Sequence, residues 1–221
     1  LTDDLEIIKK IVGIGIPVAI HALILRLSVI GLNKILSYTI YSTKAISAYT
    51  IGLQTEALSF MPGLAFSTAA TTLVGQNLGA GNIKGAEKSG WIATKFAATL
   101  MSVLGTLLII FSRPIIGFFT QDPTVIEIGS HYLIVNAIIQ PLIAISMVTS
   151  GALRGAGDAK APMLIALFTL WGIRIPLALI LGLSLGFQTD GVWVAMGASI
   201  LISSLVLAQR FKNGAWKNIK L

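Results

Sequence analysis

The chain has no cysteine among its 221 residues, which excludes disulfide bonds and thiolate metal ligands. Charged residues are also scarce: they make up 11% of this chain, against about 25% of a typical water-soluble domain. Hydrophobic residues reach 55%, so the few charges cannot cover a soluble surface of this size. The composition therefore predicts a protein whose solvent is lipid.

Groups of residues that could support catalysis are missing as well. His21 and His131 stand alone without an HExxH spacing, so a metal site is not expected. Apart from Glu56, the acids fall in loops or at the ends of apolar segments, where we expect solvated, charge-balancing roles; they are Asp3, Asp4, Glu6, Glu87, Asp122, Glu127, Asp158 and Asp190. Nothing in the sequence argues for an enzyme, a cofactor or a resident metal.

Six apolar segments are long enough to cross a bilayer, which takes roughly 17 to 25 residues. Lipid requires each backbone polar group to be satisfied within its own segment, so we expect all six to be helices of an all-α membrane protein. Pro62 and Gly63 predict a kink in the second helix. We expect residues 1–221 to form one six-helix lobe with spans at 11–32, 46–73, 91–110, 132–152, 163–183 and 192–208, and a basic tail at 209–221.

Lysine and arginine are unevenly divided between the two sides of these spans. If the N-terminus is cytoplasmic, only Lys34, Lys44 and Arg113 of the 16 basic residues lie outside, and Arg26 and Arg174 lie within spans. This asymmetry follows the positive-inside rule. It predicts a multi-pass protein of the plasma membrane with both termini cytoplasmic, and it explains the net charge of +7 without a nucleic-acid partner.

Two glycine-rich turns resemble one another across the chain. QNLGAGN (76–82) follows the second span and ALRGAGD (152–158) follows the fourth, so the sequence shows a weak internal repeat. Neither turn follows a strand or carries a phosphate-loop motif, which argues against nucleotide binding. We expect tight cytoplasmic turns shaped by Gly79, Gly81, Gly155 and Gly157.

Glu56 is the one acid placed deep inside an apolar span. Small and polar residues recur on its face of the helix at steps of three and four, which marks a face that packs on other helices or lines a cavity. A carboxylate inside the membrane costs at least ~2.5 kcal/mol and is a functional hypothesis by default. We therefore predict that Glu56 binds a coupling ion, either Na+ or a proton.

Other polar residues are predicted to complete this site. Tyr132, Asn136 and Gln140 recur every four residues on the fourth span, and with Ser59 and Tyr49 on the second span they are expected to line a cavity. Arg174 leaves a second interpretation open. A Glu56–Arg174 pair would be a structural ion pair that holds the carboxylate in its charged form.

Four stretches resemble the multidrug and toxic compound extrusion (MATE) transporters of the multidrug/oligosaccharidyl-lipid/polysaccharide flippase superfamily. They are MPGLAFSTAATTLVGQNLGAGN (61–82), SGALRGAGDAKAPM (150–163), RIPLA (174–178) with DGVWVAM (190–196), and FKNGAWK (211–217). The resemblance implies one six-helix lobe, similar to the C-terminal lobe, of a twelve-span antiporter that exports organic cations and other amphipathic compounds in exchange for Na+ or H+. Some members carry acids on the first and fourth helices of this lobe. Here those helices carry His21 with Arg26 and Asn136 with Gln140, so the coupling ion stays open.

A central cleft between two lobes needs a second wall. We expect an N-terminal half, a second copy of this chain, or a truncated product, and the first residue, Leu1 instead of Met, favours a fragment. Two other functions remain. A lobe of a flippase for lipid-linked saccharides would use cationic residues such as Arg26 and Arg174 for its anionic substrate. A structural membrane subunit would need no functional acid at all.

Overall fold

The structure, a computed structural model, describes the backbone of residues 2–218 and the side chains of residue 8 and residues 11–217. Lys220 of the predicted tail lies outside the described residues. Within that range every element is a helix, and six stretches are long and apolar enough to span a membrane. The elements are α1 (Thr2–Leu36), α2 (Ser42–Gly79), α3 (Ile83–Ile110), α4 (Ser112–Phe119), α5 (Pro123–Gly155), α6 (Lys160–Leu167), η1 (Phe168–Arg174), α7 (Ile175–Leu179), η2 (Ile180–Ser184), α8 (Gln188–Asn213) and η3 (Ala215–Asn218).

Each predicted span lies inside one of these helical stretches, and the structure adds two features. The short helix α4 precedes α5 and was not predicted. Residues 209–213, predicted as tail, continue α8 up to Gly214, whose φ of 71° ends the helix. The spans run past the apolar windows because a helix continues through polar residues until a cap or a glycine stops it.

The fifth span, Lys160–Ser184, is helical throughout but changes its winding. Residues Phe168–Arg174 and Ile180–Ser184 are π-helical, and the short α-helix α7 lies between them. Pro176 has no backbone N–H, so the ordinary hydrogen bond to the preceding turn is lost there. Wider turns of this kind occur frequently at functional sites, and Arg174 stands at the end of the first one.

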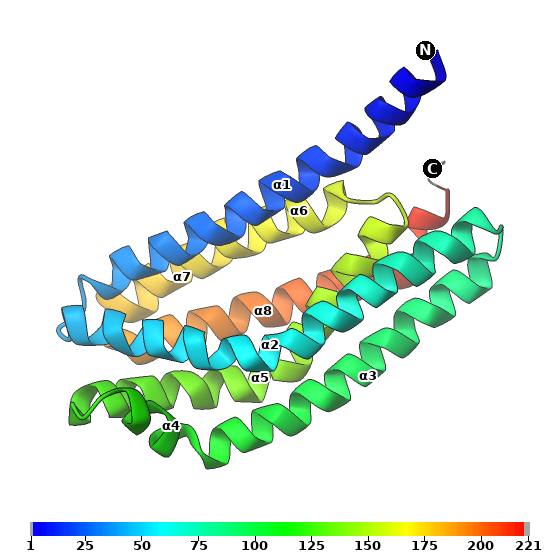
Figure 1. Cartoon of the computed structure of the whole chain (residues 1–221). Coiled ribbons are helices and arrows are strands. Elements are labelled where there is room, and N and C mark those ends of the chain that lie inside the picture. Colours follow the sequence, from blue (N-terminus) through cyan, green and yellow to red (C-terminus); the bar gives the residue numbers. More distant parts are fainter. Residues whose placement is uncertain (1, 219–221) are drawn as a thin grey trace.

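Figure 1 shows the helices running between two ends of the bundle. We call the end with the N-terminus, the turn after α2 and the turn after α5 the terminal end, and the other the opposite end. Helix α5 packs against α2, α3 and α8, while α1 lies beside α6 and α7. Helix α1 has few contacts with α2. The group of α1, α6 and α7 and the group of α2, α3, α5 and α8 are therefore not tightly packed along this side.

The α2–α5 contact depends on small residues. A Cβ atom on Gly151 would collide with Ser67, and one on Gly155 would collide with the backbone of Thr71. The two helices therefore approach closely enough for side-chain to backbone hydrogen bonds: Ser67 Oγ donates to Met147 O and Thr71 Oγ1 donates to Gly151 O, both at 2.8 Å. Small residues one turn apart are the usual means of close helix packing in membranes.

The four motif glycines have different roles. Gly81 and Gly157 have φ values of 73° and 82°, which ordinary side chains rarely adopt, so they form the turns. Gly155 is the last residue of α5 and packs on α2, while a Cβ on Gly79 would meet nothing within 4 Å. The two turns also place a capping side chain alike: Asn82 accepts from Gly85 N at 2.9 Å, and Asp158 accepts from Ala161 N at 3.3 Å.

Candidate functional site

The space between the two groups of helices is a cleft of about 510 Å³. Helices α1, α2, α5 and α8 line it together with the first half of the fifth span. Most of its surface is apolar. Its titratable lining residues are His21, Tyr49, Glu56, Tyr132, Arg154 and Arg174.

Glu56 lies in this cleft and is only 1% exposed. The Tyr132 hydroxyl of α5 donates a hydrogen bond to Glu56 Oε2 at 2.6 Å. Gly52, one turn before Glu56, permits this contact, because a Cβ at that position would collide with the Tyr132 ring. The other carboxylate oxygen, Oε1, is buried without a hydrogen-bond partner among the described residues. Half of the carboxylate therefore remains available to a cation or a proton.

The Tyr132 ring belongs to a cluster of three aromatic rings with Tyr49 and Trp193. Tyr49 and Trp193 stack with centroids 5.6 Å apart, and Tyr132 meets both rings edge-on at 5.4 and 4.9 Å. All three side chains are almost completely buried. Edge-to-face pairs of this kind add stability beyond the buried area. The Tyr132 side chain, and with it the Glu56 carboxylate, is thus held by the packing of α2, α5 and α8.

The alternative prediction of a Glu56–Arg174 ion pair is wrong for this structure. Arg174 Nε donates instead to Ser199 Oγ of α8 at 2.8 Å, and the salt bridges of the described residues do not include either Glu56 or Arg174. Each group has a closer partner on another helix, Ser199 for the guanidinium and Tyr132 for the carboxylate. Both side chains nevertheless line the same cleft.

The structure places the other predicted lining residues in two groups. Tyr49, Tyr132 and Asn136 line the cleft, whereas Gln140 and Ser59 are buried outside its lining. A step of four residues overshoots a helical turn by roughly 40°, so Gln140 is turned roughly 80° away from Tyr132. Gln140 packs instead at the position of Gly105 on α3, where a Cβ would lie 3.2 Å from Gln140 Cγ.

The sequence prediction missed the role of Arg154. It was counted only among the basic residues of the cytoplasmic side, but in the structure it lines the cleft, and its Nη2 lies 3.5 Å from Ser67 Oγ. A helical side chain leans toward the N-terminus of its helix, which turns an arginine in the last turn of α5 back into the bundle. This rule, applied to the ALRGAGD motif, could have identified Arg154 from the sequence.

The remaining ion pairs lie at the two ends, outside the cleft. At the terminal end, Arg210 binds Asp158 through Nε and Nη2 at 3.0 and 2.9 Å, and Lys217 binds Glu87 at 2.6 Å. Asp158 is buried and not solvated as predicted, because the arginine of α8 covers it.

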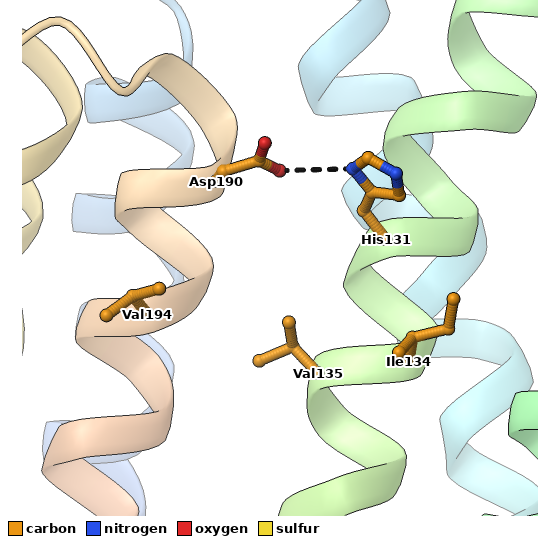
Figure 2. Close-up of a pocket in the computed structure, with 5 residues that line it drawn as sticks. All are labelled: His131, Ile134, Val135, Asp190 and Val194. Atoms are coloured by element: carbon orange, nitrogen blue, oxygen red, sulfur yellow. Dashed lines mark hydrogen bonds and ion pairs between the residues drawn. The ribbon is translucent and has the colours of Figure 1, made fainter.

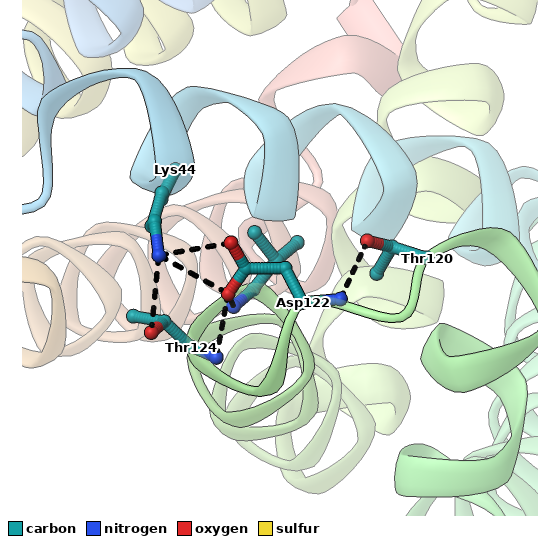
Figure 3. A network of polar contacts seen from close by, with 5 residues as sticks. Lys44, Thr120, Asp122 and Thr124 are labelled. Atoms are coloured by element: carbon teal, nitrogen blue, oxygen red, sulfur yellow. Dashed lines mark hydrogen bonds and ion pairs between the residues drawn. The ribbon is translucent and has the colours of Figure 1, made fainter.

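At the opposite end, Lys44 Nζ lies 2.9 Å from Asp122 Oδ2, as Figure 3 shows. Asp122 also accepts hydrogen bonds from the backbone N–H groups of Thr124 and Val125 at the start of α5. The hydrogen bond from Lys44 is the largest of the effects that hold the pKa of Asp122 below its usual value. This contact links the start of α2 to the start of α5.

A second, smaller hollow of about 220 Å³ lies between α5 and α8 (Figure 2). His131 Nδ1 and Asp190 Oδ1 face each other across it at 3.3 Å, above Ile134, Val135 and Val194. Both polar side chains are about half exposed. The hollow is separate from the cleft, since the two share no lining residue.

Comparison with known proteins agrees with this architecture. A family model described as MatE matches residues 17–180. A probable multidrug resistance protein NorM of Thermotoga maritima is 32% identical over 212 residues, which are 95% of this chain and 45% of that protein. The chain thus spans about half the length of the curated relatives it matches.

Solved structures resemble one half of longer chains. The MATE transporter ClbM in complex with Rb+ matches 98% of this chain and 51% of its own, with a TM-score of 0.89 and 22% identity. A MOP superfamily transporter from Pyrococcus furiosus matches 97% of this chain and 48% of its own, with a TM-score of 0.87 and 20% identity. These matches show the fold of one six-helix half. Since the family model covers most of the sequence and the Thermotoga relative is 32% identical over nearly all of it, the chain belongs to the MatE family of multidrug transporters.

Proposed function

We propose that this chain supplies one half of a cation-coupled exporter of small amphipathic compounds, and that Glu56 binds the coupling ion. The observation that carries the proposal is a buried carboxylate in the cleft with one oxygen held by Tyr132 and the other without a partner among the described residues. An isolated charge in this environment is costly, so a proton or Na+ that neutralises it is strongly favoured over an empty charged site.

Coupling follows from where this carboxylate lies. Glu56 is in contact with α5 through Tyr132, and the Tyr132 ring contacts Trp193 of α8. A cation on Oε1 changes the charge and the hydrogen bonding at the junction of three helices, and it can favour one arrangement of them over another. The structurally similar ClbM transporter was solved in complex with Rb+, which supports a monovalent cation as the ligand.

The proposed setting is the plasma membrane, with the terminal end on the cytoplasmic side. The distribution of lysine and arginine in the sequence supports this orientation. Relatives twice as long as this chain support a second six-helix lobe, either an N-terminal half or a second copy. The cleft described above belongs to one lobe alone.

The test is efflux of a fluorescent amphiphile from vesicles that contain the chain, with an imposed Na+ or pH gradient. We expect gradient-driven efflux by the wild type and its loss in Glu56→Gln, which keeps the shape of the side chain without a titratable oxygen. Glu127→Gln is the matched control, because Glu127 is an exposed acid outside the cleft. The gradient that drives efflux identifies the ion.

Equal efflux by Glu56→Gln and the wild type would contradict the proposal and favour a structural subunit. If neither the wild type nor Glu56→Gln shows efflux, the same assay is repeated with a second six-helix half co-expressed.

A flippase for anionic lipid-linked substrates is the second candidate, and one observation favours it. Two arginines, Arg154 and Arg174, line the cleft, while Arg26 is exposed and does not. Positive side chains in the cleft suit an anionic substrate. Transport of a lipid-linked anion without any dependence on Na+ or H+ gradients would support this function over coupled export.

A further inference from the structure

Arg154 reaches into the cleft and has no carboxylate partner among the side chains that the structure describes. Among the described residues its polar contact is Ser67 Oγ, at 3.5 Å from Nη2. Two other basic residues at the terminal end have carboxylate partners: Arg210 pairs with Asp158 and Lys217 pairs with Glu87. An arginine carries five N–H donors, so most of those on Arg154 have no acceptor from the described part of the chain.

A second unsatisfied donor lies beside it. Ser150 stands one turn before Arg154 on α5, lines the same cleft and is only 5% exposed. Its hydroxyl is buried without a hydrogen-bond partner among the described residues. Ser67 of α2 donates its own hydrogen bond to Met147 O at 2.8 Å. This bond fixes the position of the Ser67 hydroxyl that Arg154 contacts. A guanidinium and a hydroxyl that both lack acceptors form a suitable site for an oxyanion.

Charged side chains of both signs line the cleft. Glu56 is the single acid in the lining, and Arg154, Arg174 and His21 are the basic groups. Ser67, the contact of Arg154, follows Glu56 by three turns of α2, which is roughly 16 Å along the axis. The carboxylate and the Arg154 donors therefore lie too far apart to satisfy each other, and each is free for a ligand of opposite charge.

We propose that the terminal end of the cleft binds the anionic group of an amphipathic compound, with Arg154 and Ser150 as its donors. The anionic group is a carboxylate, sulfonate or phosphate. The apolar part of the compound lies against Ile143, Met147 and Leu207, which line the same cleft. The inference rests on the proposed exporter function, because it assigns the charge of the exported compound, but it concerns a different part of the cleft from the coupling acid.

Two sources supply this ligand chemistry, a soluble amphiphile and an anionic lipid of the surrounding membrane. Both present an oxyanion on an apolar body. Adding phosphatidylglycerol to lipid discs that contain the chain distinguishes them. If phosphatidylglycerol weakens the binding of a soluble anion, the lipid is a ligand of the site. If it does not, the soluble amphiphile is the ligand.

The experiment measures equilibrium binding by fluorescence anisotropy in lipid discs, with no ion gradient. The probes are fluorescein, an anion, and a cationic rhodamine ester with the same xanthene ring system. We expect tighter binding of the anion, weakened about tenfold by Arg154→Gln and about threefold by Ser150→Ala, as expected for charge-assisted and neutral hydrogen bonds. Lys84→Gln is the matched control, since it removes an exposed positive charge at the same end outside the cleft.

Tighter binding of the rhodamine, or anion binding that Arg154→Gln and Ser150→Ala leave unchanged, would overturn the inference. Absence of binding for both probes would overturn it too. Ser150→Ala keeps the test valid if Arg154→Gln does not fold. The two proposals are tested by different measurements: loss of ion-coupled efflux in Glu56→Gln tests the exporter, and loss of anion binding in Arg154→Gln and Ser150→Ala tests this site, so one can fail while the other holds.

Discussion

At the residue scale, the site depends on one hydrogen bond between two buried side chains. Glu56 was identified from the sequence because a carboxylate rarely occurs on the small-residue face of an apolar helix. Its partner, Tyr132, was predicted to line the cavity, but the 2.6 Å contact was not. That contact depends on Gly52, whose missing side chain leaves room for the ring. Such a long-range fit between two helices has no local signature in the sequence.

The replacement Tyr132→Phe removes this hydrogen bond and leaves Glu56 Oε2 buried without a donor. We expect the free energy of unfolding to fall by about 1–3 kcal/mol, the usual cost of an unsatisfied buried polar group. Tyr49→Phe is the matched control, because Tyr49 lies in the same aromatic cluster but its hydroxyl makes no hydrogen bond to the described residues. Thermal unfolding in detergent measures both, and equal losses in the two variants would show that the Tyr132 hydroxyl does not stabilise the carboxylate.

The geometry of a helix explains two outcomes at this scale. Gln140 was predicted in the cavity from a four-residue repeat but lies outside it, and Arg154 was counted only as a basic residue of the cytoplasmic side but lines the cleft. A helix turns 100° per residue and tilts its side chains toward its N-terminus, so a position in the sequence fixes a direction only when both effects are counted.

At the scale of the helices, the six spans could be predicted and their contacts could not. Apolar length and the requirement of internal hydrogen bonding determine the helices. The small-residue face of the second span indicated a surface that packs on other helices or lines a cavity, and the structure shows close packing between α2 and α5. The π-helical turns around Pro176 and the short helix α4 were not predicted, because a proline and a short apolar segment are compatible with several local structures.

Gly155→Ala tests this packing. Its Cβ would collide with the backbone of Thr71, and neither helix backbone can move without disturbing the hydrogen bond between Thr71 and Gly151. We expect a loss of stability of about 1–3 kcal/mol, as for other overpacked positions. Gly79→Ala adds the same methyl group where nothing lies within 4 Å, so we expect it to be neutral or slightly stabilising. Thermal unfolding measures the stability of both variants. A Gly155→Ala variant as stable as the wild type would contradict the close contact between α2 and α5.

At the scale of the whole molecule, the chain corresponds to one half of its relatives and still has a cleft of its own, mostly apolar with a few charged and polar side chains. The cleft lies between α1 with the fifth span and the bundle of α2, α5 and α8, so residues of this lobe alone line both proposed sites. The proposed coupling acid and the proposed anion site lie at different depths, which would allow one lobe to respond to both an ion and a substrate. A second lobe is proposed for the path across the membrane, not for the formation of these two sites.

The most direct measurement of the central claim is infrared difference spectroscopy of the carboxyl bands while Na+ or pH is stepped, in the chain alone and without a gradient. The account predicts a band change on cation or proton binding in the wild type and in Glu127→Gln that is absent in Glu56→Gln. The same band change in wild type and Glu56→Gln would contradict the assignment of the coupling site to Glu56.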